Sequence, residues 1–165
     1  ECDIRINHGL FPCERVLARP LGCMLRTMVA SEKYLSEKGL PKTPFDLEQH
    51  HLLGGNDLIA DSKLVLRSKN EVITVPYYPR LRLKDHVAAR TAAICGLGIS
   101  VHAFQYDTWE YVRRGQLCEV LPEWKPEPSQ VSLLLPQNKT LSSASRTLAD
   151  FIEERWKSHP HLTHD

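Results

Sequence analysis

Residues 85–101, DHVAARTAAICGLGISV, carry a helix signal followed at once by a strand signal. Asp85 can cap a helix, and apolar residues repeat from Val87 at i, i+1, i+4 and i+7. Gly96 can end that helix, and Ile99–Val101 is a compact apolar run typical of a strand. A helix that leads directly into a strand is the repeating step of α/β folds.

The same alternation continues on both sides of this stretch. The run Met24–Ala30 has little polarity, which suits a strand buried on both faces, as in a parallel sheet. Ser31 follows it as a candidate N-cap, with Gly39 at the expected helix end. Near the C-terminus, the strand Val131–Leu135 precedes an amphipathic helix over Ser142–Trp156. Strands that alternate with helices predict the α/β class.

Turn residues and apolar periodicity predict further elements. They are strands at Asp3–Ile6, Val16–Arg19, Pro79–Leu83 and Leu117–Leu121, a hairpin of Leu64–Leu66 with Val72–Val75, and helices over 44–50 and 105–114.

Composition limits the class of protein. The chain has 165 residues, about the size of one domain, and 42% of them are hydrophobic, which predicts an ordered globular fold. Its 21 Lys and Arg residues against 20 Asp and Glu give a net charge of +1. A nearly neutral chain lacks the basic field of a DNA-binding or membrane-binding module. Arg80, Arg82 and Lys84 form only a small basic edge, so we do not expect DNA contacts by this segment.

No stretch approaches the length of a membrane span, and the charged N-terminal residues do not resemble a signal peptide. These residues show a strand pattern from the first position, with no lead-in loop. We therefore expect the chain to begin inside a domain and to be a piece of a longer protein. The cysteines are odd in number, irregularly spaced and without a C-x-x-C motif. This pattern favours reduced thiols in the cytoplasm over a disulfide framework or a zinc site.

The sequence offers little support for nucleotide binding, catalysis or metal binding. Gly96-Leu97-Gly98 follows a helix and precedes a strand, the reverse of a nucleotide-binding glycine loop, and the third glycine is absent. No nucleophile motif or metalloprotease motif is present, and we expect no catalytic residues, no metal and no cofactor. His159, His161 and His164 could bind zinc or nickel, but a frayed terminal tail explains them more simply.

The order of the motifs resembles the effector-binding domain of LysR-type transcriptional regulators. Strand motifs of that domain (D-hydrophobic-A-I-R-x-G, then A-R-x-L) are similar to the first two predicted strands here. The following family motifs are A-S-P-x-Y-L, G-x-P-x-x-P-x-D-L with a frequent histidine, V-N-D, and A-A-x-x-G-L-G-I. Their counterparts in this chain are DIRINHG (3–9), LARPL (17–21), ASEKYL (30–35), GLPKTPFDL (39–47) with His50, LKD (83–85) and AAICGLGI (92–99).

Three features depart from the family pattern. Asn7 stands where the family has Arg, and His102-Ala103-Phe104 replaces Leu-Pro-x. The strand and helix with which the family's domain begins have no counterpart before Asp3, and neither do the helix-turn-helix and the linker helix.

The resemblance implies a two-lobe fold like that of type II periplasmic binding proteins, with the first strand and helix of lobe I missing. Residues 1–29 and 134–165 would then form part of lobe I, and residues 30–133 would form lobe II. A small molecule would bind between the lobes, where two surfaces can enclose it.

Seven residues are candidate effector contacts. Ser31 and Asp85 stand at predicted helix starts, where free N–H groups attract anions, although both can equally be ordinary N-caps. Lys84 can neutralise a carboxylate or simply be solvated. Asn7 and His8 end the first strand, either at a ligand edge or in a plain turn. The other two candidates, Ser100 and His102, are expected to alternate to one face of their strand, and His102 can instead be a packed core histidine.

The resemblance also implies a function and its partners. The chain would sense a small metabolite, with an anion as one candidate class, form a homodimer or homotetramer, and relay the signal to DNA through the absent N-terminal domain. The main alternative is the solute-binding protein of a transport system with the same fold, and an enzyme of the same architecture is a third hypothesis. The upstream coding sequence discriminates the first two, because a transport protein needs a signal peptide and a regulator needs a helix-turn-helix.

Overall fold

The computed structural model describes residues 3–9, 16–55, 63–83, 85–137, 141–158 and 162–163. The chain divides into two compact units: unit 1 comprises Glu1–Leu25 and Pro128–Asp165, and unit 2 comprises Arg26–Glu127. The chain therefore enters unit 2 after Leu25 and leaves it before Pro128. Both boundaries lie a few residues before the lobe limits at 29 and 134 that the sequence suggested.

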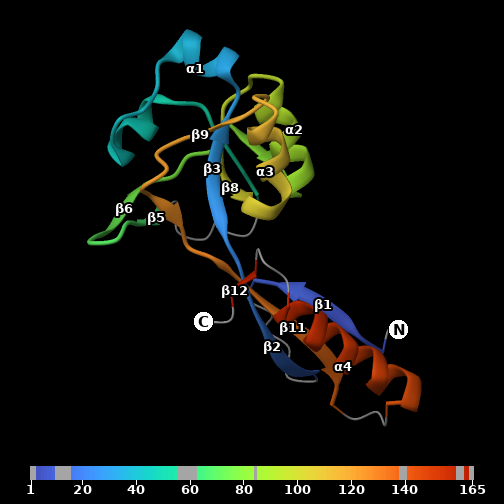
Figure 1. Ribbon diagram of the computed structural model, residues 1–165. Coiled ribbons are helices and arrows are strands. Elements are labelled where there is room, and N and C mark those ends of the chain that lie inside the picture. The colour runs from blue at the N-terminus through green and yellow to red at the C-terminus, as the bar shows by residue number, and fades with distance from the viewer. Residues whose placement is uncertain are drawn as a thin grey trace. The chain divides into compact units, whose positions relative to one another are not determined.

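Unit 1 is a small antiparallel sheet with one helix on it. Its strand order is β1-β11-β2-β12, and the long α4 runs alongside β1, β11 and β2 (Figure 1). The elements are β1 (Arg5–His8), β2 (Val16–Met24), β11 (Ser129–Pro136), α4 (Ser143–Lys157) and β12 (Leu162–Thr163). β11 pairs with β1 on one side and with β2 on the other, so its apolar residues Leu133 and Leu135 are buried.

The sequence predicts that α4 starts at Ser142 or Ser143, and its N-cap is Ser142. The Ser142 hydroxyl accepts a hydrogen bond from the Ser145 amide at 3.0 Å, which satisfies a free N–H of the first turn. Ala149 is buried on the inner face of the helix, and the Arg19 guanidinium of β2 reaches Glu153 at 3.1 Å. Packing and this ion pair together hold α4 on the sheet.

Unit 2 is built on a mixed five-stranded sheet of order β7-β4-β8-β3-β9. The strands are β3 (Arg26–Ala30), β4 (Leu52–Gly55), β7 (Leu81–Leu83), β8 (Ile99–Phe104) and β9 (Cys118–Glu119). All five residues of β3 are buried, as the apolar run predicts. The expected parallel environment is wrong, however, because β3 pairs antiparallel with both β8 and β9, and only β7, β4 and β8 run parallel.

Both faces of this sheet are covered, which explains why the residues of its central strands β3 and β8 are almost all buried. On one face lie α2 (His86–Ile94) and α3 (Gln105–Arg113). On the other lies the β5–β6 hairpin (Lys63–Arg67 and Val72–Pro76), and β10 (Lys125–Pro126) pairs with β5 (Figure 1). We call the two cores the helix-side core (Val29, Leu53, Ala92, Ala93, Ala103 and Leu117) and the hairpin-side core, which includes Met28, Ala30, Leu64, Leu66, Tyr77, Ile99 and Val101.

The first helix of unit 2, α1 (Glu32–Lys38), begins at the predicted N-cap Ser31. A short helix predicted at 44–50 is a 3-10 helix, η1 (Pro44–Gln49). Asp46 accepts hydrogen bonds from the amides of Lys42 and Thr43 at 2.9 and 2.8 Å, and these bonds hold the start of η1. They also lower the pKa of the Asp46 carboxyl.

Gly98 is required by the close approach of two segments. The Ile99 amide donates to the His51 carbonyl at 2.8 Å, and a Cβ added to Gly98 would overlap that same carbonyl oxygen. Gly96, two residues earlier, has φ +79°, the left-handed conformation that ends α2. The G-x-G pattern therefore serves the passage from α2 into β8.

No helix of the described residues is long and apolar enough to cross a membrane.

Candidate functional site

The carboxyl ends of three strands meet at one edge of the unit 2 sheet. Because β7, β4 and β8 are parallel, their last residues lie at the same edge, and the antiparallel β3 begins there at Arg26. α2 starts directly after β7 and α3 directly after β8. In α/β sheets, ligands bind outside this edge because loops and helix N-termini gather there. We refer to it as the carboxyl edge.

The predicted residue Asp85 stands at this edge, at the start of α2. Asp85 is exposed and caps α2, with its Oδ1 accepting a hydrogen bond from the Ala88 amide at 2.7 Å. This bond accounts for one free N–H of the helix and agrees with the N-cap alternative. Lys84, the residue before it, lies outside the described residues.

Aromatic rings gather where β8 passes into α3. The Phe104 ring lies 5.1 Å from the His86 ring and 5.7 Å from the Tyr106 ring, measured between centroids. Phe104 occupies the N-cap position of α3, and its side chain cannot accept a hydrogen bond. The N–H groups of the first turn of α3 therefore receive no side-chain cap from this position. The edge thus offers aromatic surface beside a helix N-terminus.

Arg26 adds a positive charge to the same place. It stands opposite Phe104 in the β3–β8 ladder, and its guanidinium carbon lies 5.7 Å from the centroid of the Phe104 ring. Its exposed fraction is only 8%. Sequence reasoning missed this residue, although a single arginine within the apolar run Met24–Ala30 was a visible signal.

A β-bulge separates the two predicted residues of β8. Ser100 pairs with Val29 and Ala103 pairs with Thr27, so three steps along β8 match two steps along β3. Opposite residues share a face, and Ser100 therefore lies with Val29 in the helix-side core. The extra residue places His102 on the other face, where its ring meets the Tyr77 ring edge-on at 5.5 Å. The expectation that Ser100 and His102 share a face is wrong for this reason.

His102 is buried in an apolar setting. Neither Nδ1 nor Nε2 has a hydrogen-bond partner, and both atoms are shielded from solvent. Burial, reinforced by the nearby Arg26 charge, lowers the pKa of His102 to about 3. The imidazole is therefore neutral at physiological pH, with one donor and one acceptor nitrogen.

Ser31 lies at the opposite edge of the sheet from Asp85. It follows the last residue of β3, whereas the carboxyl edge is at the first. Its hydroxyl accepts from the Tyr34 amide at 3.3 Å and its exposed fraction is 5%, both typical of a structural N-cap. The structure does not bring Ser31 and Asp85 together.

Ser31 and Tyr34 instead belong to a network that joins two of the sequence motifs. The Tyr34 hydroxyl lies 3.2 Å from His50 Nδ1 and accepts from the His51 amide at 2.8 Å. Arg80 approaches His51 Nε2 at 2.6 Å. Burial lowers the pKa of His50 and of His51, so both rings favour the neutral form that such contacts need. This network explains the pairing of S-x-x-Y with the later histidine.

In unit 1, Asn7 and His8 end β1. The Asn7 side-chain amide donates to the carbonyl oxygens of His8 at 3.2 Å and Gly9 at 3.4 Å, and the Gly9 amide donates to Gln130 at 2.8 Å. Asn7 therefore shapes the turn after β1, while the His8 side chain is exposed.

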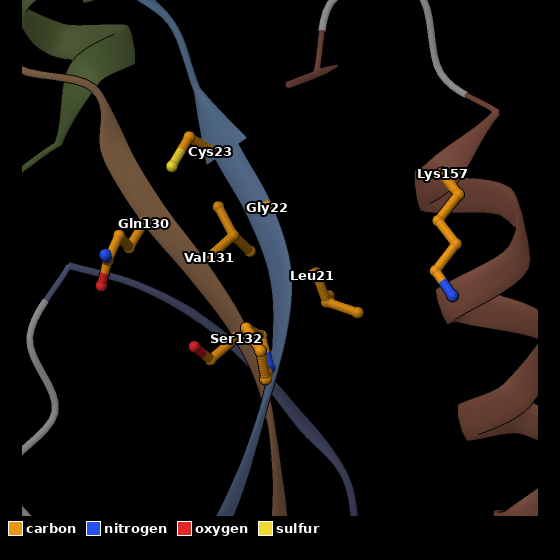
Figure 2. A pocket seen from close by; sticks show the side chains of 8 residues that line it. Leu21, Gly22, Cys23, Gln130, Val131, Ser132 and Lys157 are labelled. Carbon is orange, nitrogen blue, oxygen red and sulfur yellow. The ribbon is translucent and has the colours of Figure 1, made fainter. Parts of the chain in front are cut away.

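A hollow of about 500 Å³ lies elsewhere in unit 1 and contains none of the predicted residues. It forms where a bulge at Leu21 shifts the register between β2 and β11. In Figure 2 the polar ends of Gln130 and Ser132 project from β11 away from α4, which carries Lys157. The lining residues are Pro20, Leu21, Gly22, Cys23, Gln130, Val131, Ser132 and Lys157.

No cluster of three or more potential metal ligands occurs among the residues that the structure describes. The histidines of the C-terminal tail, His159, His161 and His164, lie outside them.

Known proteins with similar sequences are named as HTH-type transcriptional regulators. The chain is 33% identical over 142 residues to the uncharacterized HTH-type transcriptional regulator YhjC of Escherichia coli K12, covering 85% of this chain and 47% of that protein. It is 22% identical over 162 residues to the probable HTH-type transcriptional regulator SinR of Salmonella typhimurium, covering 97% of this chain and 51% of that protein. The chain thus spans about half the length of these curated relatives.

Solved structures with the same fold are regulatory domains. The regulatory domain of AphB from Vibrio vulnificus is similar with a TM-score of 0.74 and 25% identity, covering 93% of this chain and 75% of that chain. Full-length AphB of Vibrio cholerae, a virulence activator, has a TM-score of 0.76 and 27% identity, covering 97% of this chain and 52% of that chain. The fold is the α/β fold of periplasmic binding proteins, as the sequence predicts. Residues 1–157 match the LysR substrate binding domain family, and the chain belongs to that family.

Proposed function

We propose that this chain is the part of a DNA-binding transcriptional regulator that binds a small effector and changes the regulator's activity. Its family is one of transcriptional regulators, and the curated relatives, of which it spans about half, are named as HTH-type transcriptional regulators. In the full-length protein, effector binding shifts the population of regulator conformations, and DNA occupancy changes with it. The regulator acts as a homodimer or homotetramer in the cytoplasm, where its DNA target is.

The carboxyl edge of unit 2 is the proposed effector surface of that unit. The observation that carries this assignment is the group of Arg26, Phe104 and His86 at the uncapped start of α3. The Arg26 guanidinium and the backbone N–H groups at the start of α3 are complementary to a small anionic molecule, and the rings offer apolar contact to its carbon skeleton.

Of the seven residues predicted from sequence, five remain proposed effector contacts. They are Lys84, Asp85 and His102 in unit 2 and Asn7 and His8 in unit 1. We assign Ser31 and Ser100 structural roles instead, because one caps α1 at the opposite edge and the other faces the helix-side core.

The test uses the full-length protein in two steps. A thermal-shift screen of a metabolite library that contains anions, cations and neutral compounds identifies ligands of the native state, since such a ligand raises the melting temperature. Genomic DNA fragments enriched by the protein are then footprinted with and without each ligand. A ligand that raises the melting temperature and changes the footprint is the expected result. Ligands that bind but leave DNA affinity and footprint unchanged would contradict the proposal.

A further inference from the structure

His102 has a hydrogen-bonding capacity that the protein itself does not use. Both ring nitrogens are buried and neither has a partner. A buried polar group without a hydrogen-bond partner destabilises the folded state, which suggests that a ligand satisfies it.

The β8 bulge brings this imidazole to the same face as Arg26 and Phe104. Met28 lies in the hairpin-side core, and side chains alternate along β3, so Arg26 points to that face as well. Phe104 stands opposite Arg26 and contacts its guanidinium, while His102 packs on Tyr77 of the same core. The Arg26 charge is close enough to lower the pKa of His102. One cation and one neutral donor–acceptor pair therefore lie close together at the carboxyl edge.

The surrounding charges favour an anion over a cation. Two helices, α2 and α3, begin at this edge and direct partial positive charge toward it. Among the described residues, Asp85 at this edge accepts from the Ala88 amide, and Asp107 forms an ion pair with Arg90 through Oδ1. A ligand carboxylate would therefore meet the Arg26 guanidinium and the N-termini of the two helices.

The neutral His102 imidazole limits which functional group, besides the carboxylate, the ligand can place beside it. An ammonium group beside His102 would be repelled by Arg26, which disfavours amino acids. A keto oxygen can only accept, whereas a hydroxyl can donate or accept and so pairs with either tautomer of the ring. We propose that this cluster selects a small hydroxycarboxylate, with the carboxylate on Arg26 and the hydroxyl on His102. The assignment rests on the proposed function, because it concerns the same edge of unit 2.

Calorimetric titration of the full-length protein with matched pairs of acids tests this assignment. The pairs are lactate and propionate, malate and succinate, and salicylate and benzoate, which differ within each pair by one hydroxyl. For at least one pair we expect the hydroxy acid to bind about tenfold more tightly, the value of one buried hydrogen bond. The His102→Leu variant, which removes both ring nitrogens and keeps an apolar side chain, should bind both acids of that pair equally and at the affinity of the acid without hydroxyl.

Two controls keep the result specific. Ser31→Ala, a loss of a hydroxyl at the opposite edge, should leave the tenfold preference intact. In the wild type, the ¹⁵N shifts of the His102 ring should move with the hydroxy acid and not with its partner, a readout that needs no variant.

Several results would overturn the assignment. They are equal affinities within every pair, a preference that survives in His102→Leu, or no binding by any of the six acids. If a cationic or neutral metabolite from the library binds and changes the DNA footprint instead, the hydroxycarboxylate assignment fails while the proposed function stands.

Discussion

His102 shows how one residue couples stability to pH at the carboxyl edge. Burial, with the Tyr77 ring against the imidazole, and the Arg26 charge lower its pKa to about 3 in the folded protein, against about 6.5 for an exposed histidine. Below pH 6.5 the unfolded chain therefore binds a proton that the folded protein excludes. The contribution of His102 to the free energy of unfolding is complete above pH 6.5 and declines as the pH falls toward 3.

We expect the wild type to lose about 2–3 kcal/mol relative to His102→Leu between pH 7 and pH 4.5. Urea unfolding of both proteins at each pH measures this difference and removes the contributions of His50 and His51, which both proteins share. Parallel pH profiles for the two proteins would contradict the burial of an unpartnered imidazole.

Ser31 can be an N-cap or an effector contact, and the two roles predict different effects of its substitution. As an N-cap it satisfies the Tyr34 amide, so Ser31→Ala should cost about 1 kcal/mol in the free energy of unfolding. Chemical denaturation measures the cost, and Ser31→Asp, which keeps a capping oxygen, is the matched control with a smaller loss. A loss of effector affinity in Ser31→Ala, as the sequence-based hypothesis requires, would count against the structural role.

At the scale of elements, the passage from α2 into β8 is fixed by a single glycine. Gly98→Ala would drive a Cβ into the His51 carbonyl that accepts the Ile99 amide, so the β4 segment and β8 must separate. We expect a loss of about 2 kcal/mol or more in the free energy of unfolding. Thermal and urea unfolding measure it.

Gly115→Ala is the control for this contact. Gly115 has φ +70°, yet a Cβ there meets nothing within 4 Å, so its substitution reports backbone strain alone. It should cost about 1–2 kcal/mol. If the two variants behaved alike and Gly98→Ala were fully stable, the close approach of His51 to β8 would be refuted.

At the scale of the whole molecule, the two units differ in the number of chain segments that form them. Unit 2 is one continuous segment, Arg26–Glu127, and carries both of its cores. Unit 1 takes strands from both ends, since β11 lies between β1 and β2. We therefore expect a 26–127 fragment to fold alone with a cooperative thermal transition, and peptides 1–25 and 128–165 to stay unfolded separately and to gain structure when mixed. Circular dichroism of each fragment and of the mixture measures this. A non-cooperative 26–127 fragment would contradict the independence of unit 2.

Much of the fold could be predicted from sequence because its signals are local. The caps Ser31, Asp85 and Ser142 are where short-range patterns placed them, since an N-cap acts within three residues. The buried character of β3 also follows from its own composition. Its antiparallel pairing does not, because apolar strands look the same in either direction.

Which side chains lie together at the carboxyl edge could not be predicted from sequence, because it depends on pairing between distant segments. A bulge has no reliable sequence signal, so His102 and Ser100 were expected on one face. Arg26 and Phe104 are 78 positions apart and meet only through the β3–β8 ladder. The order of motifs along the chain was sufficient for the family and for the α/β class, because both depend on local pattern and its sequence. Only the tertiary structure decided which charged and aromatic side chains share an edge, because strand direction and register are set by pairing between distant segments.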